Sequence, residues 1–274
     1  MNRQGARETG KTLAVLGFGK MGEALTRGIA RSQHFSSILV TDIVEERLNS
    51  ATKQGFRATK ANSLAAAEAD VVLVAVKPYD VGTVLREIGG FFSEGKLLLS
   101  IAAGVPIGFI EGLMPSAKIV RAMPNITAAV REAVTAVSFN NRVQREEKEF
   151  ALKIFGSVGE VVEVEESHLN VITALSGSGP GYMFRIIEAL SEGAVNEGLS
   201  AELALKLSAH VAIGAGRMIL ETGKSPDELT RMVATPGGTT EAGLREMEEG
   251  KVAIALARAV ASATRRAKEL SAKI

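Results

Sequence analysis

The sequence contains no cysteine and no tryptophan, and each absence removes a class of chemistry. Without cysteine, the chain has no disulfide, no thiol nucleophile and no cysteine-ligated zinc or iron–sulfur centre. The three histidines, His34, His168 and His210, lie far apart and lack the spacing of metal ligands. Aromatic residues make up only 4% of the chain, which argues against the stacking surfaces that single-stranded nucleic acids need.

The charges are nearly balanced, because 32 Lys and Arg residues face 31 Asp and Glu residues. This balance argues against a surface for nucleic acid or for an anionic membrane. Residues 1–11 are polar and lack the apolar stretch of a signal peptide. The longest later run without a charged residue, 169–184, contains glycine and proline and is too short to span a membrane. We therefore expect a soluble, cytoplasmic protein with no nucleic-acid and no membrane partner.

Short β-branched runs alternate with helical stretches over residues 12 to about 163. The run 71–76 is continuously apolar, which is typical of a strand buried on both faces of a parallel sheet. This alternation predicts an α/β fold with a Rossmann-type, doubly wound sheet. The expected strands are 12–16, 37–41, 71–76, 97–101, 118–122, 135–139 and 160–164, and the expected helices are 21–31, 45–53, 81–88, 107–113 and 144–155.

After residue 166 the strand signals end, and Ala, Leu, Glu and Lys recur at helical spacing. We predict a dinucleotide-binding domain over 1–166 and an all-α domain for substrate binding and dimerisation over 167–274. One apolar stripe follows Leu203, Leu207, Val211 and Gly214, and it is either an ordinary core or a subunit interface, which we favour. The expected helices are 182–196, 201–221, 226–232, 241–249 and 252–272.

A glycine-rich loop follows the first expected strand and opens the first helix: Gly17, Phe18, Gly19, Lys20, Met21 and Gly22. The first glycine permits the tight turn, the second lets backbone N–H groups approach a pyrophosphate, and the third lets helix pack on strand. The plain alternative is a tight connection without a ligand. Asp42 ends the next strand 20 residues after Gly22, which favours a dinucleotide site.

Asp42 also bears on the choice of cofactor. A carboxylate at this position hydrogen-bonds the ribose 2′-OH of NAD and repels the 2′-phosphate of NADP. The alternative is that Asp42 only caps the helix expected at 45–53. We predict that NADH is at least competitive with NADPH.

Two small, hydroxyl-bearing segments each precede an expected helix in the second half. They supply free N–H and O–H donors at a helix N-terminus, where the partial positive charge favours an anion. Routine helix capping is the alternative. Two such segments in a dinucleotide-binding protein predict a small carboxylate substrate, with candidate contacts at Ser176, Gly177, Ser178, Gly179, Gly238, Thr239 and Thr240.

The second half offers His168, His210 and Tyr182, but none stands in a recognisable arrangement for a catalytic base. His210 lies among apolar residues, as expected for a packed core histidine. A dehydrogenase that oxidises an alcohol needs such a base, whereas a protonated imine needs little beyond a positioned hydride.

Five segments together resemble the pyrroline-5-carboxylate reductases, over nearly the whole chain. They are residues 17–24, 75–78 (Ala-Val-Lys-Pro), 121–125 (Arg-Ala-Met-Pro-Asn), 175–180 (Leu-Ser-Gly-Ser-Gly-Pro) and 236–240 (Pro-Gly-Gly-Thr-Thr). The resemblance implies the reduction of 1-pyrroline-5-carboxylate to L-proline with NADPH or NADH. It also implies a helical C-terminal domain that forms a homodimer or a larger ring of dimers.

The same resemblance implies roles for individual residues. Besides the glycine loop, it places the cofactor against Asn62, Ala75, Val76, Lys77, Pro78, Ala102, Ala103, Gly104, Met123, Pro124 and Asn125. Ser176 and Thr240 then supply hydroxyl groups to the substrate, while Gly238 and Thr239 supply backbone contacts. We expect Thr240 to orient the ring nitrogen, as the catalytic residue, without acting as a strong base.

The chain departs from the family at two places: Ile126-Thr127 stands where Thr-Pro is usual, and Asp42-Ile43 stands where many members carry Ser, Asn or Arg. Two other functions remain open. A 3-hydroxyacid dehydrogenase needs a catalytic Lys on the first helix of the second domain, and residues 183–194 contain Arg185 but no Lys. The second open function is that of a regulator that binds a dinucleotide without catalysing a reaction.

Overall fold

The computed structural model describes residues 10–93 and 95–274, and the chain forms two compact units. The first comprises the chain as far as Ser178 together with Ala263–Ile274, and the second is Gly179–Ser262. The geometric division thus falls after the domain boundary expected at residue 166, and the end of the last helix belongs to the first unit.

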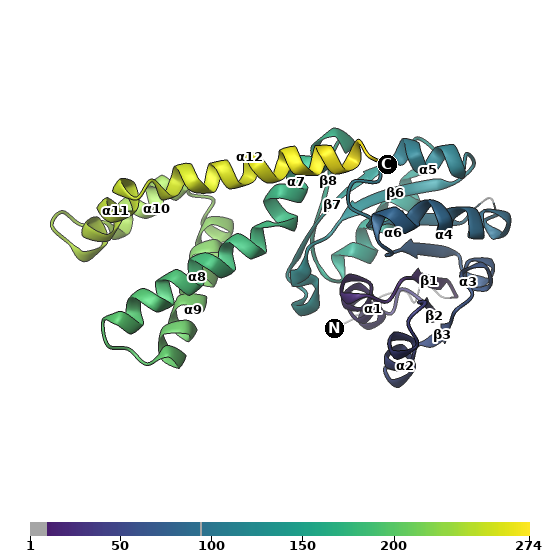
Figure 1. The fold of residues 1–274 in the computed structure, drawn as a ribbon, viewed down its shortest axis with the longest axis horizontal. Helices are drawn as coiled ribbons and strands as arrows, with labels where there is room; N and C mark the ends of the chain where they lie inside the picture. The colour runs from purple at the N-terminus through teal and green to yellow at the C-terminus, as the bar shows by residue number, and fades with distance from the viewer. Residues whose placement is uncertain (1–9, 94) are drawn as a thin grey trace, which may run out of the picture. The chain divides into compact units, whose positions relative to one another are not determined.

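The first unit is built on an eight-stranded sheet of order β3-β2-β1-β4-β5-β6-β7-β8 (Figure 1). All neighbouring strands are parallel except β6 and β7, which are antiparallel. The chain steps from β1 outward to β3 and then back to β4, so the order reverses between β1 and β4. This confirms the predicted Rossmann-type sheet. The strands are β1 (Thr12–Leu16), β2 (Ser37–Thr41), β3 (Arg57–Thr59), β4 (Val71–Val74), β5 (Leu97–Ser100), β6 (Lys118–Met123), β7 (Ala133–Phe139) and β8 (Gly159–Glu163).

Alternate residues of the strands enter two hydrophobic cores, one on each face of the sheet. In β1, Leu13 and Val15 join one core while Ala14 and Leu16 join the other. Helices cover both faces, which is why the central strands are apolar throughout. The first core is covered by α1 (Lys20–Ser32) and α6 (Arg145–Gly156), and the second by α3 (Asn62–Glu68), α4 (Val81–Ile88) and α5 (Ile107–Leu113).

The sequence did not predict β3 or α3. The three residues of β3 are too few to show a period, and the Ala-rich α3 is only two turns long. The expected strand 71–76 ends at Val74, because Ala75 and Val76 leave the sheet for the site described below. The helix expected at 45–53 is confirmed as α2 (Glu45–Lys53).

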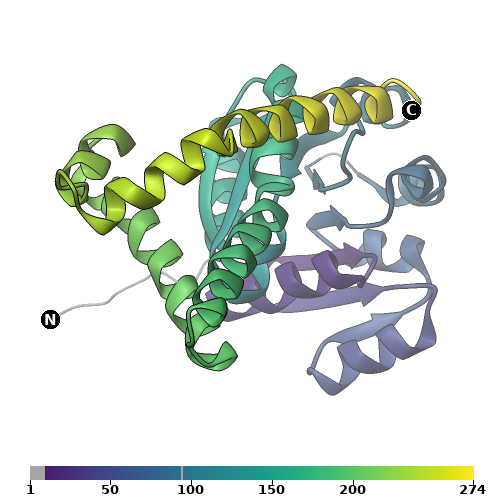
Figure 2. The same ribbon diagram turned by 60° about the vertical axis from the view of Figure 1, so that its left-hand side comes forward.

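The second unit contains α8 (Gly179–Asn196), α9 (Ala201–Thr222), α10 (Pro226–Val233), α11 (Thr239–Glu249) and the first part of α12 (Val252–Ser271). The helices α8 and α9 lie side by side (Figures 1 and 2). Local signals delimit these helices: the Ser200 hydroxyl accepts a hydrogen bond from the Leu203 N–H at the start of α9, and Gly223 ends it with a φ of 64°.

Most apolar side chains of the second unit are exposed in the single chain. The stripe of α9 is among them, with Leu203 44%, Leu207 48% and Val211 63% exposed. An ordinary intrachain core is therefore the wrong interpretation of that stripe. His210 is exposed as well, so the expectation of a packed core histidine is also wrong in the single chain.

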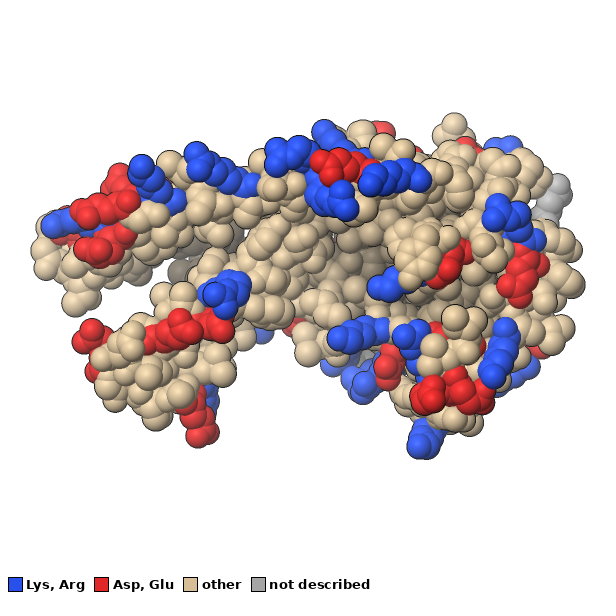
Figure 3. Space-filling model, in the orientation of Figure 1, with Lys and Arg blue, Asp and Glu red and all other residues tan. Residues whose placement is uncertain are grey.

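Acidic and basic side chains are intermixed over the face seen in Figure 3. This distribution fits the near-neutral net charge of the sequence. Within residues 10–93 and 95–274, one helix, α9, is long and apolar enough to cross a membrane by length and composition alone.

Candidate active site

The three glycines of the loop between β1 and α1 have three different surroundings. Gly17 has a φ of +100°, and a Cβ there would lie 2.9 Å from the carbonyl carbon and oxygen of Ala75. A Cβ on Gly22 would lie 2.1 Å from the Gly17 carbonyl oxygen, so a residue without a side chain is needed here for α1 to pack on β1. Beside Gly19, by contrast, the nearest atom is an Arg47 nitrogen at 4.0 Å. The space at Gly19 is left open, as the approach of a ligand to the backbone requires.

The loop delivers a helix N-terminus to the point where the strand order reverses. Gly19 is the N-cap of α1 and, having no side chain, covers none of the first N–H groups of the helix. The N–H groups of Lys20 and Met21 at the start of α1 are therefore available to an anion, and the helix dipole favours negative charge there. A dinucleotide pyrophosphate fits this arrangement.

Asp42 is buried, and its carboxylate is hydrogen-bonded to the glycine loop. One oxygen accepts a hydrogen bond from the Phe18 N–H at 2.8 Å, and the other accepts one from the Val44 N–H at 2.9 Å. The Arg47 guanidinium forms an ion pair with this carboxylate at 3.2 Å. Asp42 thus fastens the β1–α1 loop to the β2–α2 loop, a role that spacing alone did not indicate.

The other predicted cofactor segments follow the carboxyl ends of parallel strands and so lie along the same edge of the sheet. Ala75, Val76, Lys77 and Pro78 follow β4, Ala102, Ala103 and Gly104 follow β5, and Met123, Pro124 and Asn125 end or follow β6. Asn62 joins the same edge at the start of α3, because its side-chain oxygen accepts a hydrogen bond from the Thr41 hydroxyl at 2.5 Å.

Asn125 links this edge to the first predicted substrate segment. Its side-chain nitrogen donates to the Ser176 carbonyl at 3.0 Å. Its side-chain oxygen accepts from the Thr127 hydroxyl at 2.6 Å and from the Val134 N–H at 3.2 Å. At the next residue, a Cβ on Gly177 would lie 2.8 Å from the Met123 methyl carbon, so the two segments are in close contact.

The first substrate segment is not the open loop that the sequence predicted. Ser176 and Gly177 belong to a π-helical turn, η5 (Thr173–Gly177), and α8 begins directly afterwards at Gly179. The Ser178 N–H donates to the Thr173 carbonyl at 2.9 Å, so this donor is already used. Single π-helical turns are frequent at functional sites. The expectation of a free helix N-terminus here is therefore wrong for the Ser178 N–H.

The second substrate segment does end in a helix N-terminus, within the second unit. Gly238 is the N-cap of α11, which begins at Thr239 rather than at the expected Glu241. Gly237 has a φ of +72°, and its N–H donates to the Glu241 carboxylate at 2.6 Å. The N–H groups of Thr239 and Thr240 occupy the first turn, where no intrahelical partner exists.

One buried ion pair was missed by the sequence analysis. The Arg121 side chain, 8% exposed, contacts the Glu166 carboxylate at 2.7 Å, and the same oxygen accepts the Ile107 N–H at 2.7 Å. This pair ties β6 to the start of the helical half. An arginine in the middle of a mostly apolar strand was the available signal, because a buried charge requires a partner.

Comparisons with known proteins agree with this geometry. The sequence model of the family described as "Pyrroline-5-carboxylate reductase dimerisation" matches residues 166–270, and that described as "NADP oxidoreductase coenzyme F420-dependent" matches residues 12–104. The pyrroline-5-carboxylate reductase of Methanosarcina acetivorans is 39% identical over 265 residues, covering 95% of this chain and 98% of that protein.

Two solved structures are similar over almost their full length. The pyrroline carboxylate reductase of Plasmodium falciparum with NADP bound has a TM-score of 0.88 and 30% identity, covering 95% of this chain and 98% of that one. The pyrroline-5-carboxylate reductase of Coxiella burnetii has a TM-score of 0.88 and 37% identity, covering 96% and 99%.

Proposed function

Because the chain belongs to the pyrroline-5-carboxylate reductase family, an NAD(P)H-dependent oxidoreductase family, we propose that it reduces 1-pyrroline-5-carboxylate to L-proline, the last step of proline biosynthesis. The observation that carries this proposal is the bond from the Asn125 side chain to the Ser176 carbonyl. It joins the edge of the sheet predicted to hold the nicotinamide to a segment predicted to hold the substrate. Hydride transfer requires such proximity.

The cofactor is NADPH or NADH, and when bound it supplies the hydride. In our proposal the N–H groups of Lys20 and Met21 hold its pyrophosphate against the positive end of α1. Asn62 contacts its adenosine end and Asp42 lies beside its ribose. Met123, Pro124 and Asn125 face its nicotinamide end, with the remaining predicted segments lining the edge between.

The substrate is proposed to bind as a protonated imine with a free carboxylate. The hydride joins the carbon of the C=N bond, whose π electrons become the nitrogen lone pair, and the resulting amine takes a proton from water. No strong base is needed for this step. The Ser176 hydroxyl donates to the Ile172 carbonyl at 3.1 Å, so its free capacity is that of an acceptor, suited to an N–H⁺ group.

The remaining donors suit the carboxylate and the ring nitrogen. We assign the carboxylate to the Thr239 N–H, because the Gly238 N–H, which the sequence also predicted as a contact, already donates to the Thr235 carbonyl at 2.9 Å. The Ser178 hydroxyl and Gly179, beside the π-helical turn, are further contacts. The Thr240 hydroxyl then orients the ring nitrogen.

We also propose that the chain is a homodimer, alone or within a larger ring of dimers, and that it acts in the cytoplasm. The exposed apolar side chains of the second unit support a dimer, because a monomer rarely leaves such a surface in water. The apolar helix α9 would then pack against a second copy rather than in a membrane, in keeping with the matched dimerisation family.

The experiment compares NAD(P)H consumption with 1-pyrroline-5-carboxylate in wild type, Thr240→Ala and Thr240→Ser. Loss of the hydroxyl bond costs roughly 1–3 kcal/mol, so Thr240→Ala should lower kcat/KM about ten- to a hundredfold while leaving NAD(P)H affinity unchanged. Thr240→Ser retains the hydroxyl and should keep most activity. A fully active Thr240→Ala enzyme would overturn the assignment of Thr240, and an inactive wild type would overturn the proposed reaction.

A further inference from the structure

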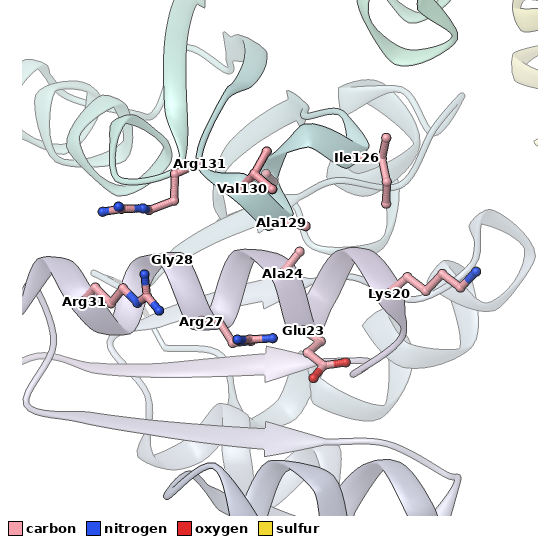
Figure 4. A pocket seen from close by; sticks show the side chains of 11 residues that line it. Lys20, Glu23, Ala24, Arg27, Gly28, Arg31, Ile126, Ala129, Val130 and Arg131 are labelled. Carbon is pink, nitrogen blue, oxygen red and sulfur yellow. The ribbon is translucent and has the colours of Figure 1, made fainter. Parts of the chain in front are cut away.

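A hollow of about 420 Å³ opens between α1 and the 3₁₀ helix η3 (Ile126–Val130), both in the first unit (Figure 4). Its base is formed by small, buried residues that leave the space unfilled: Ala24, Gly28 and Ala128. Gly28 cannot carry a side chain, since a Cβ there would lie 2.1 Å from a Val158 methyl carbon. The volume lies within the range of small-molecule sites.

The rim of this hollow is strongly basic. Lys20, Arg27, Arg31 and Arg131 line it, with Glu23 as the single acid. The Glu23 carboxylate accepts a hydrogen bond from the Gln54 side chain at 2.8 Å. The guanidinium groups of Arg27, Arg31 and Arg131 form neither a hydrogen bond nor an ion pair with any residue that the structure describes (10–93 and 95–274). All three arginines are exposed, so their guanidinium groups are accessible to an anion from solvent.

Arg131 adds an independent observation, because its backbone is strained. It ends η3 with a φ of 62° and a ψ of 32°, the left-handed region that favours glycine or asparagine. The turn itself needs only backbone groups, since the Arg131 N–H donates to the Ala128 carbonyl at 3.1 Å. Backbone strain of this kind is found at functional sites, where the side chain has a use that glycine would not serve.

We propose that this hollow is a second ligand site, which takes a small, multiply phosphorylated anion of the nucleoside triphosphate class. Guanidinium groups form two parallel hydrogen bonds to phosphate oxygens, and Arg31 and Arg131, at one end of the hollow, suit neighbouring phosphates of such an anion (Figure 4). Ile126 and Val130, 41% and 69% exposed, offer an apolar wall to the base or sugar.

The hollow adjoins the predicted cofactor site at Lys20, but its arginines lie away from that site. Arg27 and Arg31 lie seven and eleven residues beyond Lys20 along α1, hence roughly 10 and 16 Å from the N-terminus of the helix. In Figure 4, Arg31 and Arg131 lie at the same end of the hollow, opposite Lys20.

The test titrates ATP without magnesium into the full-length protein saturated with NADPH, by calorimetry, with inorganic tripolyphosphate as the competitor. We expect one site per chain, competition by tripolyphosphate, and an affinity about tenfold lower in Arg31→Ala and in Arg131→Gly. Arg142→Ala removes an exposed arginine outside the hollow and is the matched control, with unchanged affinity expected.

Arg131→Gly separates ligand binding from folding. Glycine relieves the left-handed strain, so the variant should keep or raise Tm while losing ATP affinity. Three results would each overturn the proposal: no ATP binding in the NADPH-saturated protein, an equal loss of affinity in Arg142→Ala, or full affinity in Arg131→Gly.

Discussion

At the scale of single residues, the glycine loop contains two glycines that the fold requires and one that it does not. Gly17 and Gly22 are fixed by the fold, through a positive φ and through a close approach to the neighbouring backbone. Gly19 is different, because its surroundings would accept a side chain. The spacing of the motif predicted a separate reason for each glycine, and the contacts at Gly17 and Gly22 agree with the two conformational ones. The approach of a ligand at Gly19 stays a prediction.

Gly19→Val should therefore fold normally and lose its cofactor. The backbone at Gly19, with φ −73° and ψ −177°, is an extended conformation that valine adopts without strain. Its branched side chain would occupy the space through which the pyrophosphate approaches, so we expect at least a hundredfold weaker NADPH binding with an unchanged Tm. Gly108→Val, at another open position, is the control. Unchanged NADPH affinity in a folded Gly19→Val protein would disprove the assigned pyrophosphate site.

Asp42 and Arg47 should shift cofactor preference in opposite directions. The Asp42 carboxylate disfavours a 2′-phosphate, and the paired Arg47 guanidinium offsets part of that charge. Wild type should use NADH at least as well as NADPH. Asp42→Asn should raise the ratio of kcat/KM for NADPH to that for NADH by about tenfold, and Arg47→Ala should lower it. A ratio that moves in the same direction in both variants would show that the pair does not face the ribose.

At the scale of elements, the continuous apolar strands and amphipathic helices were predictable because burial on two faces leaves a plain pattern. The π-helical turn η5 was not. It runs into residues 176–181, which are rich in Ser and Gly and typical of a loop, and the bond that anchors it comes from Asn125, 51 residues before Ser176. Pro180 is compatible with a helix because it lies in the first turn of α8, where the missing N–H would have no intrahelical partner. Such an anchor depends on tertiary contact, which local sequence does not encode.

Asn125→Ala should loosen the π-helical turn and damage catalysis together. It leaves the Ser176 carbonyl and the Val134 N–H without their partner, which costs about 1–3 kcal/mol of unfolding free energy. We expect a lower urea midpoint and a kcat/KM reduced about tenfold. In Asn125→Asp the acceptor bonds remain but the donor to Ser176 is lost, so activity should fall more than stability. Wild-type activity in both variants would mean that this anchor does not position the substrate segment.

At the scale of the whole molecule, the two units differ in how they bury apolar surface. The sheet unit has two full cores, whereas α8 to α11 bury only Ser191, Ala204 and Ser208 in the single chain. The sequence indicated a stripe of small and apolar residues on α9 but did not decide between a core and an interface. Exposure in the folded chain decides against an intrachain core.

Light scattering should therefore give a mass of at least about 58 kDa, twice the 28.8 kDa of one chain. Val211→Glu puts a charge into the exposed stripe and should yield monomers or a protein with a lower, concentration-dependent Tm. Phe91→Glu, an equally drastic change at an exposed residue of the sheet unit, should leave the mass unchanged. A stable wild-type monomer would contradict the proposed dimer.

The central claim is that the chain delivers a hydride from NAD(P)H to the imine carbon of 1-pyrroline-5-carboxylate. The most direct test supplies cofactor carrying deuterium as the transferred hydride and analyses the product by mass spectrometry and NMR. We predict L-proline with one deuterium, on the ring carbon that formed the C=N bond. Product without deuterium at that carbon, or no proline at all, would contradict this claim.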